Sequence, residues 1–66
     1  MKLTVNGNSV ELPDGSTVTA LLMHLAIDAA RVAVERNEDV VPRRTWTETQ
    51  LCDGDAVEVV TFVGGG

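Results

Sequence analysis

The sequence predicts an α+β fold in which a mixed sheet of four or five strands packs on one helix. Apolar and polar residues alternate near both ends of the chain, which is the pattern of half-buried strands. Between these regions lies one apolar stripe at helical spacing. The chain has 66 residues, of which 44% are hydrophobic, so it can bury one small core.

The first two strands are predicted to form a hairpin. Leu3 and Val5 alternate with polar residues, and residues 10–12 repeat the alternation. Residues 6–9 include asparagine and glycine, which tolerate the positive φ angles of a tight turn. Pro13 lacks the backbone N–H that a sheet ladder needs, so the second strand is expected to end there.

One helix of about three turns is predicted to follow the hairpin. Ser16 or Thr17 can cap its N-terminus through a side-chain oxygen. The stripe occupies positions i, i+3, i+4 and i+7, which are Val18, Leu21, Leu22 and Leu25. The helix is expected to end within residues 26–28.

The second half of the chain is predicted to supply the remaining strands. Val32 and Val34 alternate with their neighbours in a third strand. Residues 37–39 form a polar turn, and residues 40 and 41 form a short strand that Pro42 ends.

The last strand is predicted at residues 56–63, after a turn at residues 53–55. Before that turn we expect a helical turn within residues 46–51, with Trp46 and Leu51 at the edge of the core. The last strand carries apolar residues on both of its sides, which is typical of a central strand. This order of elements is that of a β-grasp, a mixed sheet wrapped across a single helix.

The two sides of the last strand are expected to meet different surroundings. Val57 and Val59 lie on one side, and Val60 and Phe62 lie on the other. A helix with one apolar stripe can cover only one face of the sheet. We therefore expect Val60 and Phe62 to stand exposed on the open face, where apolar side chains commonly mark a protein interface.

Composition argues against several classes of protein. Five basic and ten acidic residues give a formal net charge of −5, which opposes binding to the phosphate backbone of nucleic acids. No apolar run is long enough to span a membrane, and no signal-peptide block follows Met1. One cysteine can form no internal disulfide, which favours a reducing, cytoplasmic setting. One cysteine and one histidine are too few ligands for a zinc or iron–sulfur site.

The chain stops at three glycines, Gly64, Gly65 and Gly66, which are predicted to form a flexible tail beyond a domain at residues 1–63. The α-carboxylate of Gly66 is ionised at neutral pH. A slender arm that ends in a carboxylate can thread a narrow channel in a partner protein. Activation there, typically as an acyl-adenylate, would make the carbonyl carbon electrophilic. The alternative is a frayed end without a role.

Four other polar side chains are interpreted as structural. His24 has no ligand or triad partner at suitable spacing, so we expect a partly exposed histidine on the flank of the helix. Cys52 has no basic neighbour to activate its thiol, so we expect a small packed residue. Asp53 and Asp55 surround one glycine without the further oxygen ligands that calcium needs, so we expect them to form a turn.

Several motifs along the whole chain match one family. They are Asn6-Gly7, Thr17-Val18 with Leu21-Leu22, residues 32–37, Val41-Pro42-Arg43 with Trp46, Leu51 before Asp53-Gly54-Asp55, and residues 57–66. In these motifs the chain resembles the ThiS-type sulfur carriers, small ubiquitin-like proteins of thiazole formation in thiamine biosynthesis. Pro42-Arg43 with Trp46, and Asp53-Gly54-Asp55, are the specific part, which distinguishes ThiS-like from MoaD-like carriers. Gly64 departs from the family's double glycine and leaves the terminal pair intact.

The resemblance implies a carrier that partner enzymes act on, and not an enzyme. An E1-like, ThiF-type adenylyltransferase would use ATP and Mg²⁺ to adenylate the Gly66 carboxylate. Sulfur from a cysteine desulfurase and its persulfide relay would then produce a thiocarboxylate, which would donate sulfur to a ThiG-type thiazole synthase. Gly64 and Gly65 would thread the partner's channel, and Val60, Phe62 and Arg43 would bind the partner. The chain itself would hold no cofactor or metal.

Three other functions remain open from the sequence. A MoaD-like small subunit of molybdopterin synthase would use the same chemistry at Gly66. A ubiquitin-like modifier would join Gly66 to lysine side chains. A plain interaction or RNA-binding β-grasp domain would leave the tail without a role, although the acidic balance argues against RNA.

Overall fold

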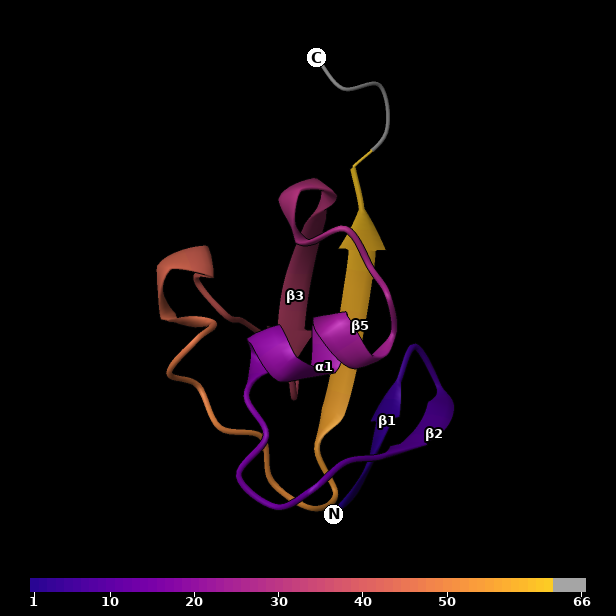
Figure 1. Cartoon of the computed structure of the whole chain (residues 1–66). Coiled ribbons are helices and arrows are strands. Elements are labelled where there is room, and N and C mark those ends of the chain that lie inside the picture. Colours follow the sequence, from indigo (N-terminus) through magenta and orange to yellow (C-terminus); the bar gives the residue numbers. More distant parts are fainter. Residues whose placement is uncertain (63–66) are drawn as a thin grey trace.

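Five strands form one mixed sheet in the computed structural model, which describes residues 1–62 of the chain (Figure 1). In chain order they are β1 (Lys2–Val5), β2 (Asn8–Glu11), β3 (Val32–Arg36), β4 (Asp39–Val40) and β5 (Ala56–Thr61). Their order across the sheet is β2-β1-β5-β3-β4. The β1–β5 pair is parallel and the other three pairs are antiparallel. The central place predicted for the last strand is therefore confirmed.

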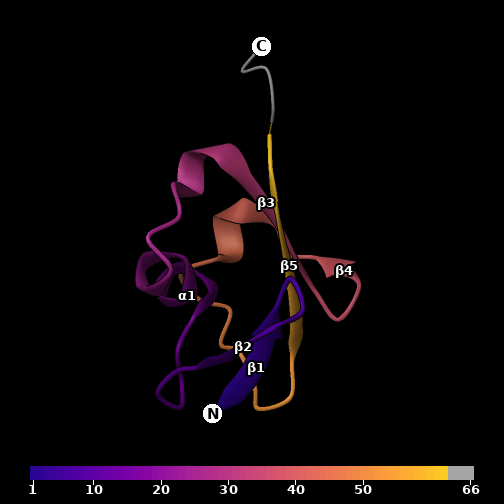
Figure 2. The same cartoon turned by 90° about the vertical axis from the view of Figure 1, so that its right-hand side faces the viewer.

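One face of this sheet is covered by the helix α1 (Val18–His24) and two 3₁₀ helices, η1 (Ala29–Arg31) and η2 (Arg43–Thr45). Figure 2 shows the sheet nearly edge-on, with these helices on one side of β5. The buried apolar side chains lie between the two layers: Leu3, Val5, Leu12, Val18, Leu21, Leu22, Val32, Val34, Val41, Trp46, Leu51, Val57 and Val59. The predicted β-grasp arrangement is confirmed.

The first hairpin closes through a tighter turn than the sequence predicts. Asn6 and Gly7 have φ angles of 50° and 83°, and Val5 pairs directly with Asn8. β2 therefore begins two residues earlier than expected. The Asn6 side chain also donates to the Val59 carbonyl at 3.1 Å and accepts from the Val59 N–H at 2.8 Å, which ties the turn to β5.

The helix is shorter than the three turns that the apolar stripe predicts. Thr17, and not Ser16, caps it by accepting a 3.2 Å hydrogen bond from the Ala20 N–H. At the other end, the Ile27 N–H bonds to the Leu22 carbonyl, and Ala26 has a φ angle of 56°. This left-handed C-terminal cap stops α1 at His24, although the sequence offers no glycine there to signal it.

The boundaries around β4 also differ from the prediction. The turn contains only Asn37 and Glu38, both with positive φ, so Asp39 belongs to β4 and pairs with Arg36. The helical turn expected within residues 46–51 lies earlier, at η2, directly after Pro42. The predicted place of Trp46 and Leu51 in the core is confirmed, because both side chains are buried.

Residues 53–55 form the predicted turn before β5, with Gly54 at a φ angle of 88°. Asp55 is buried and accepts from the Cys52 N–H at 2.8 Å and from the Asn37 side chain at 3.0 Å. Asp53 accepts from the backbone N–H of Lys2 at 2.7 Å. Asp55 therefore holds the turn closed, and Asp53 ties the turn to β1. Cys52 is exposed, so its prediction as a packed residue is wrong: its neighbour Leu51 fills the core instead.

Some predictions fall outside the described residues. These are Val63 at the end of the predicted last strand, the boundary of the domain at residue 63, and the flexible tail at Gly64, Gly65 and Gly66. Within residues 1–62, no helix has the length and apolar character needed to cross a membrane.

Candidate functional site

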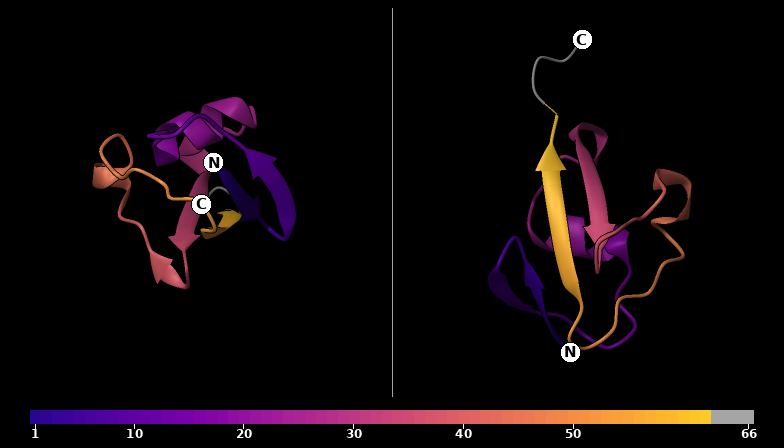
Figure 3. Two further views of the ribbon diagram at one scale, coloured as in Figure 1. Left: turned by 90° about the horizontal axis from the view of Figure 1, so that it is seen from below. Right: turned by 180° about the vertical axis from the view of Figure 1, so that it is seen from behind.

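The face of the sheet opposite α1 carries the apolar side chains that the sequence places on the outer side of β5. Val57 and Val59 are buried beneath the helix layer, and Val60 and Phe62 are each 54% exposed. Figure 3, seen from behind, shows β5 in front of α1 with β1 and β3 on its two sides. The predicted exposure of Val60 and Phe62 is confirmed, and their role in docking stays a prediction.

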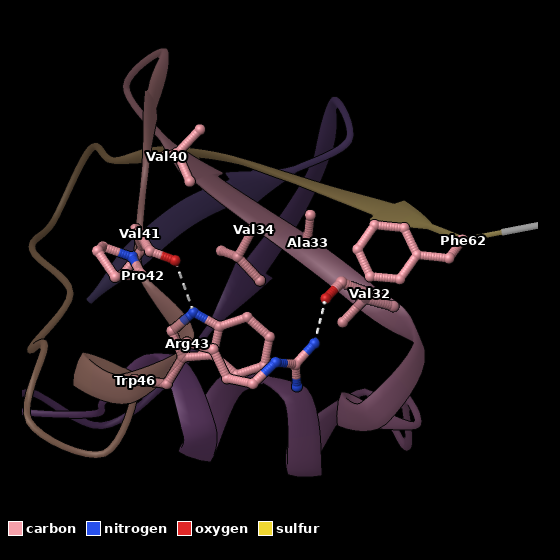
Figure 4. A pocket seen from close by; sticks show the side chains of 9 residues that line it. All are labelled: Val32, Ala33, Val34, Val40, Val41, Pro42, Arg43, Trp46 and Phe62. Atoms are coloured by element: carbon pink, nitrogen blue, oxygen red, sulfur yellow. Dashed lines mark hydrogen bonds between the residues drawn. The ribbon is translucent and has the colours of Figure 1, made fainter. Parts of the chain in front are cut away.

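The register of the sheet adds two residues to this surface. Ala33 on β3 lies directly opposite Val60, and Val40 on β4 is 70% exposed. Figure 4 shows Ala33 and Val40 pointing to the same side of β3. We call the set Ala33, Val40, Val60 and Phe62 the open-face patch. The sequence analysis missed Ala33 and Val40 because the pairing of strands far apart in the chain cannot be read from alternation alone.

A pocket of about 180 Å³ continues the open-face patch around the outer edge of β3. It exists because β4 is short: β4 pairs only with Glu35 and Arg36, so the first part of β3 has β5 on one edge and no strand of the described chain on its outer edge. Phe62 lies at one end of the pocket, and Pro42 and Arg43 border it farther along (Figure 4). Val60 does not line it.

Arg43 forms the polar part of the pocket wall and is held by contacts within the chain. Its guanidinium donates to the backbone carbonyls of Ala29 and Val32 and lies 4.5 Å from the centre of the Trp46 ring. Trp46 in turn donates from Nε1 to the Val41 carbonyl at 2.9 Å. The structure thus gives Arg43 a positioning role that the sequence did not suggest. Its predicted contact with a partner stays a prediction.

Two glutamates lie on the same face as the open-face patch, one next to Val60 along β5 and one opposite Val40. Glu58 precedes Val60 by two residues on β5, so both side chains point to the same face. Glu35 lies directly opposite Glu58 on β3. The candidate site is therefore an exposed apolar surface with a pocket along the outer edge of β3 and two carboxylates that adjoin it at Val60 and Val40.

The predicted reactive group lies outside the described residues, at Gly66, as do Gly64 and Gly65. The last described link to the sheet is the Phe62 N–H, which donates to the Arg31 carbonyl at 2.7 Å. Only four residues follow Phe62 in the sequence. The open-face patch therefore adjoins the start of the predicted tail along the chain.

The four residues of the open-face patch are all apolar. Residues 1–62 contain no group of three or more histidine, cysteine or acidic side chains placed to hold a metal ion. His24 is exposed on α1, as expected, and α1 lies on the other side of the sheet (Figure 2). The arrangement is suited to binding another protein.

Comparison with known proteins places these features in a family. The model of the ThiS family matches residues 3–66. The sulfur carrier protein ThiS of Bacillus subtilis is 38% identical over 65 residues, which are 97% of this chain and 98% of that protein. The crystal structure of the thiamine biosynthesis protein ThiS from Geobacter metallireducens superimposes with a TM-score of 0.86 at 42% identity, and covers the whole of both chains.

A second kind of relative is much longer. The thiazole synthase of Paramagnetospirillum magneticum is 44% identical to this chain over 66 residues, which are the whole chain but 20% of that protein. The thiazole synthase of Magnetococcus marinus matches to the same extent. The chain thus spans about a fifth of the length of these thiazole synthases, each of which contains a region similar to it.

Proposed function

The chain belongs to the ThiS family, and from this premise we propose that it carries sulfur for thiazole formation in thiamine biosynthesis. The observation that carries the proposal is the match, over nearly the full length of both chains, to a protein named as a sulfur carrier. The similarity between the structures, with a TM-score of 0.86, supports the same function. In this proposal the chain is a co-substrate of other enzymes, and it holds no cofactor itself.

The proposed reactive group is the carboxylate of Gly66. A carboxylate is a poor electrophile, so an E1-like, ThiF-type adenylyltransferase first joins it to the AMP part of ATP, with Mg²⁺ in the partner's site, and pyrophosphate leaves. A persulfide sulfur, supplied by a cysteine desulfurase relay, then attacks the carbonyl carbon and AMP leaves. A thiol reduces the resulting S–S bond, and Gly66 keeps one sulfur as a thiocarboxylate. Because the cycle uses ATP and thiols, we place it in the cytoplasm.

The three glycines suit this role because they have no side chains. Gly64 and Gly65 can pass through a channel too narrow for any other residue type. An extended chain spans at most about 3.6 Å per residue, so Gly66 can lie no farther than about 14 Å from Phe62. A partner that docks on the open-face patch must therefore have its reactive site within this distance of Phe62.

Docking itself is assigned to Val60 and Phe62, with Arg43 as a contact at the pocket. Both apolar side chains are half exposed. Phe62 lies at one end of the pocket, and Val60 lies opposite Ala33, which lines the pocket. Exposed apolar surface that is bordered by charge commonly marks a protein interface. The thiazole synthase is proposed as the acceptor of sulfur, because two proteins of that name contain a region similar to this chain.

Genetic rescue tests the proposed function against its alternatives. We expect the gene to restore growth without thiazole in a strain that lacks its own sulfur carrier for thiamine. We expect no rescue of a strain that lacks the small subunit of molybdopterin synthase. The reverse pattern would favour the MoaD-like function, and Gly66 joined to lysine side chains of many proteins would favour a modifier. Rescue by a chain without Gly65 and Gly66 would show that the tail has no role.

A further inference from the structure

Two carboxylates face each other on the open side of the sheet. Glu35 on β3 and Glu58 on β5 are direct partners in the antiparallel register, and they point to the same face as Val60. Directly opposed residues have Cβ atoms about 4.5–5.5 Å apart, and like charges in such a pair destabilise the sheet. The free domain therefore keeps an unfavourable interaction at the border of its exposed apolar surface.

No cation within the described part of the chain forms an ion pair with either glutamate. Three of the arginines are engaged elsewhere. Arg31 lies 3.5 Å from Asp28, and Arg36 donates to the Gln50 carbonyl at 2.8 Å. Arg43 donates to the carbonyls of η1 and β3. The charge of Glu35 and Glu58 is thus left for an external group.

We propose that Glu35 and Glu58 together receive one arginine side chain of the thiazole synthase, while an apolar side chain of the same surface enters the pocket beside Phe62. The inference rests on the proposed function and adds the chemistry by which the partner is recognised. A guanidinium has five N–H donors in a planar fork, so it can bond to both carboxylates at once, whereas a lysine ammonium acts as a point charge. The bound arginine would also remove the repulsion between the two glutamates.

The thiazole synthase is the favoured occupant for two reasons. Two proteins of that name each contain a region similar to this chain, joined in one polypeptide to the rest of the thiazole synthase. This covalent link keeps the similar region at a high effective concentration beside the rest of that protein. In addition, the chain has a formal net charge of −5, so a partner surface with a basic group gains in association rate as well as in contact energy.

The proposal predicts opposite effects on binding and on stability. Replacing Glu35 or Glu58 by glutamine keeps the shape of the side chain and removes one of two repelling charges. The free domain should become more stable, because like charges no longer oppose each other. Binding to the thiazole synthase should become weaker, because a charge-assisted hydrogen bond is lost. A purely structural role of the glutamates would lower stability and binding together.

The test compares the full chain with the variants E35Q, E58Q and E35Q/E58Q. Isothermal titration calorimetry with purified thiazole synthase gives the Kd, and urea unfolding gives the stability. We expect the Kd of the double variant to rise about tenfold and to depend less on salt than that of the unchanged chain. The matched control is E48Q, which removes the same charge from an exposed residue in the turn after η2. We expect the Kd of this control to stay within about twofold.

Three results would overturn the inference. One is a Kd that changes no more in E35Q/E58Q than in E48Q, and another is no measurable binding of the unchanged chain to the thiazole synthase. The third is self-association of the chain through this face, detected by sedimentation and abolished in the double variant. The test of sulfur transfer is separate from the test of binding. If binding depends on Glu35 and Glu58 but Gly66 never becomes a thiocarboxylate, the proposed function is overturned and the inference about binding is not.

Discussion

Replacing Phe62 by aspartate separates the docking role of this residue from a role in folding. The change places a charge at the end of the pocket and removes the largest side chain of the open-face patch. We expect binding to the activating enzyme and to the thiazole synthase to fall by at least about tenfold, since central aromatic residues dominate most protein interfaces. We expect the domain to remain folded.

The expected loss of stability follows from exposure. Full burial of a phenylalanine stabilises a protein by about 1.5–3 kcal/mol. Phe62 is 54% exposed, so it contributes less than half of this, about 1 kcal/mol. A domain of this size has a stability of about 3–10 kcal/mol. By contrast, Leu21 has no exposed surface, and Leu21→Ala should cost about 2–5 kcal/mol.

Two measurements on the same samples provide the assay. Urea unfolding followed by Trp46 fluorescence gives the stability, and calorimetric titration with each partner gives the Kd. Met23→Asp is the matched control, because Met23 is 76% exposed on α1, on the covered side of the sheet (Figure 2). It should leave both Kd values nearly unchanged.

The reasoning would be refuted if Phe62→Asp unfolded the domain, because Phe62 would then belong to the core. It would also be refuted if Phe62→Asp and Met23→Asp weakened binding equally. In that case the open-face patch would not be the docking surface.

Three further predictions concern the tail, a turn and the pocket wall. Deletion of Gly65 and Gly66 should abolish sulfur transfer in a reconstituted assay and leave the Tm nearly unchanged, since glycines have no side chains to pack; a large fall in Tm would contradict this. Glu38→Gly should stabilise the domain by about 0.5–1 kcal/mol in urea unfolding, because Glu38 has a φ angle of 72°, which glycine adopts without strain; a loss of stability would show that the side chain has a favourable contact. Trp46→Phe should destabilise it by about 1–2 kcal/mol, because the Val41 carbonyl loses its 2.9 Å hydrogen bond from the indole; an unchanged urea midpoint, followed here by circular dichroism because this variant has no tryptophan, would show that this bond contributes nothing.

The sequence predicted those parts of the fold that depend on local periodicity. Leu3 and Val5 alternate as a strand with one buried side, and Val18, Leu21 and Leu22 repeat at helical spacing. Both patterns follow from chain geometry alone, so they survive in the structure. The apolar residues on both sides of residues 56–63 likewise indicated a central strand, which β5 is.

Two of the errors lie at boundaries where the backbone adopts positive φ without a glycine. Ala26 ends α1 early, and Glu38 shortens the turn before β4, with φ angles of 56° and 72°. Neither residue type favours that conformation. Hydrogen bonds that close the cap or the strand pair impose it, such as the bond from the Ile27 N–H to the Leu22 carbonyl. Composition alone gives no signal for such positions.

The candidate site was predictable only in part. The exposure of Val60 and Phe62 followed from a simple count, since one helix cannot cover two faces of a sheet. The pocket could not be foreseen, because it depends on how far β4 pairs along β3 and on the position of Arg43 over Trp46. The opposition of Glu35 and Glu58 likewise depends on register between strands that lie far apart in sequence.

Intact-mass spectrometry tests the central claim, that other enzymes charge the terminus of this chain with sulfur. The full chain is incubated with the ThiF-type enzyme, ATP, Mg²⁺, a cysteine desulfurase, free cysteine as the sulfur source and a thiol reductant, and the product is fragmented to locate the change. We predict a mass increase equal to one sulfur minus one oxygen, located at Gly66 and also present in a Cys52→Ser variant. An unchanged mass would contradict the account, and so would the addition of a whole sulfur atom at Cys52.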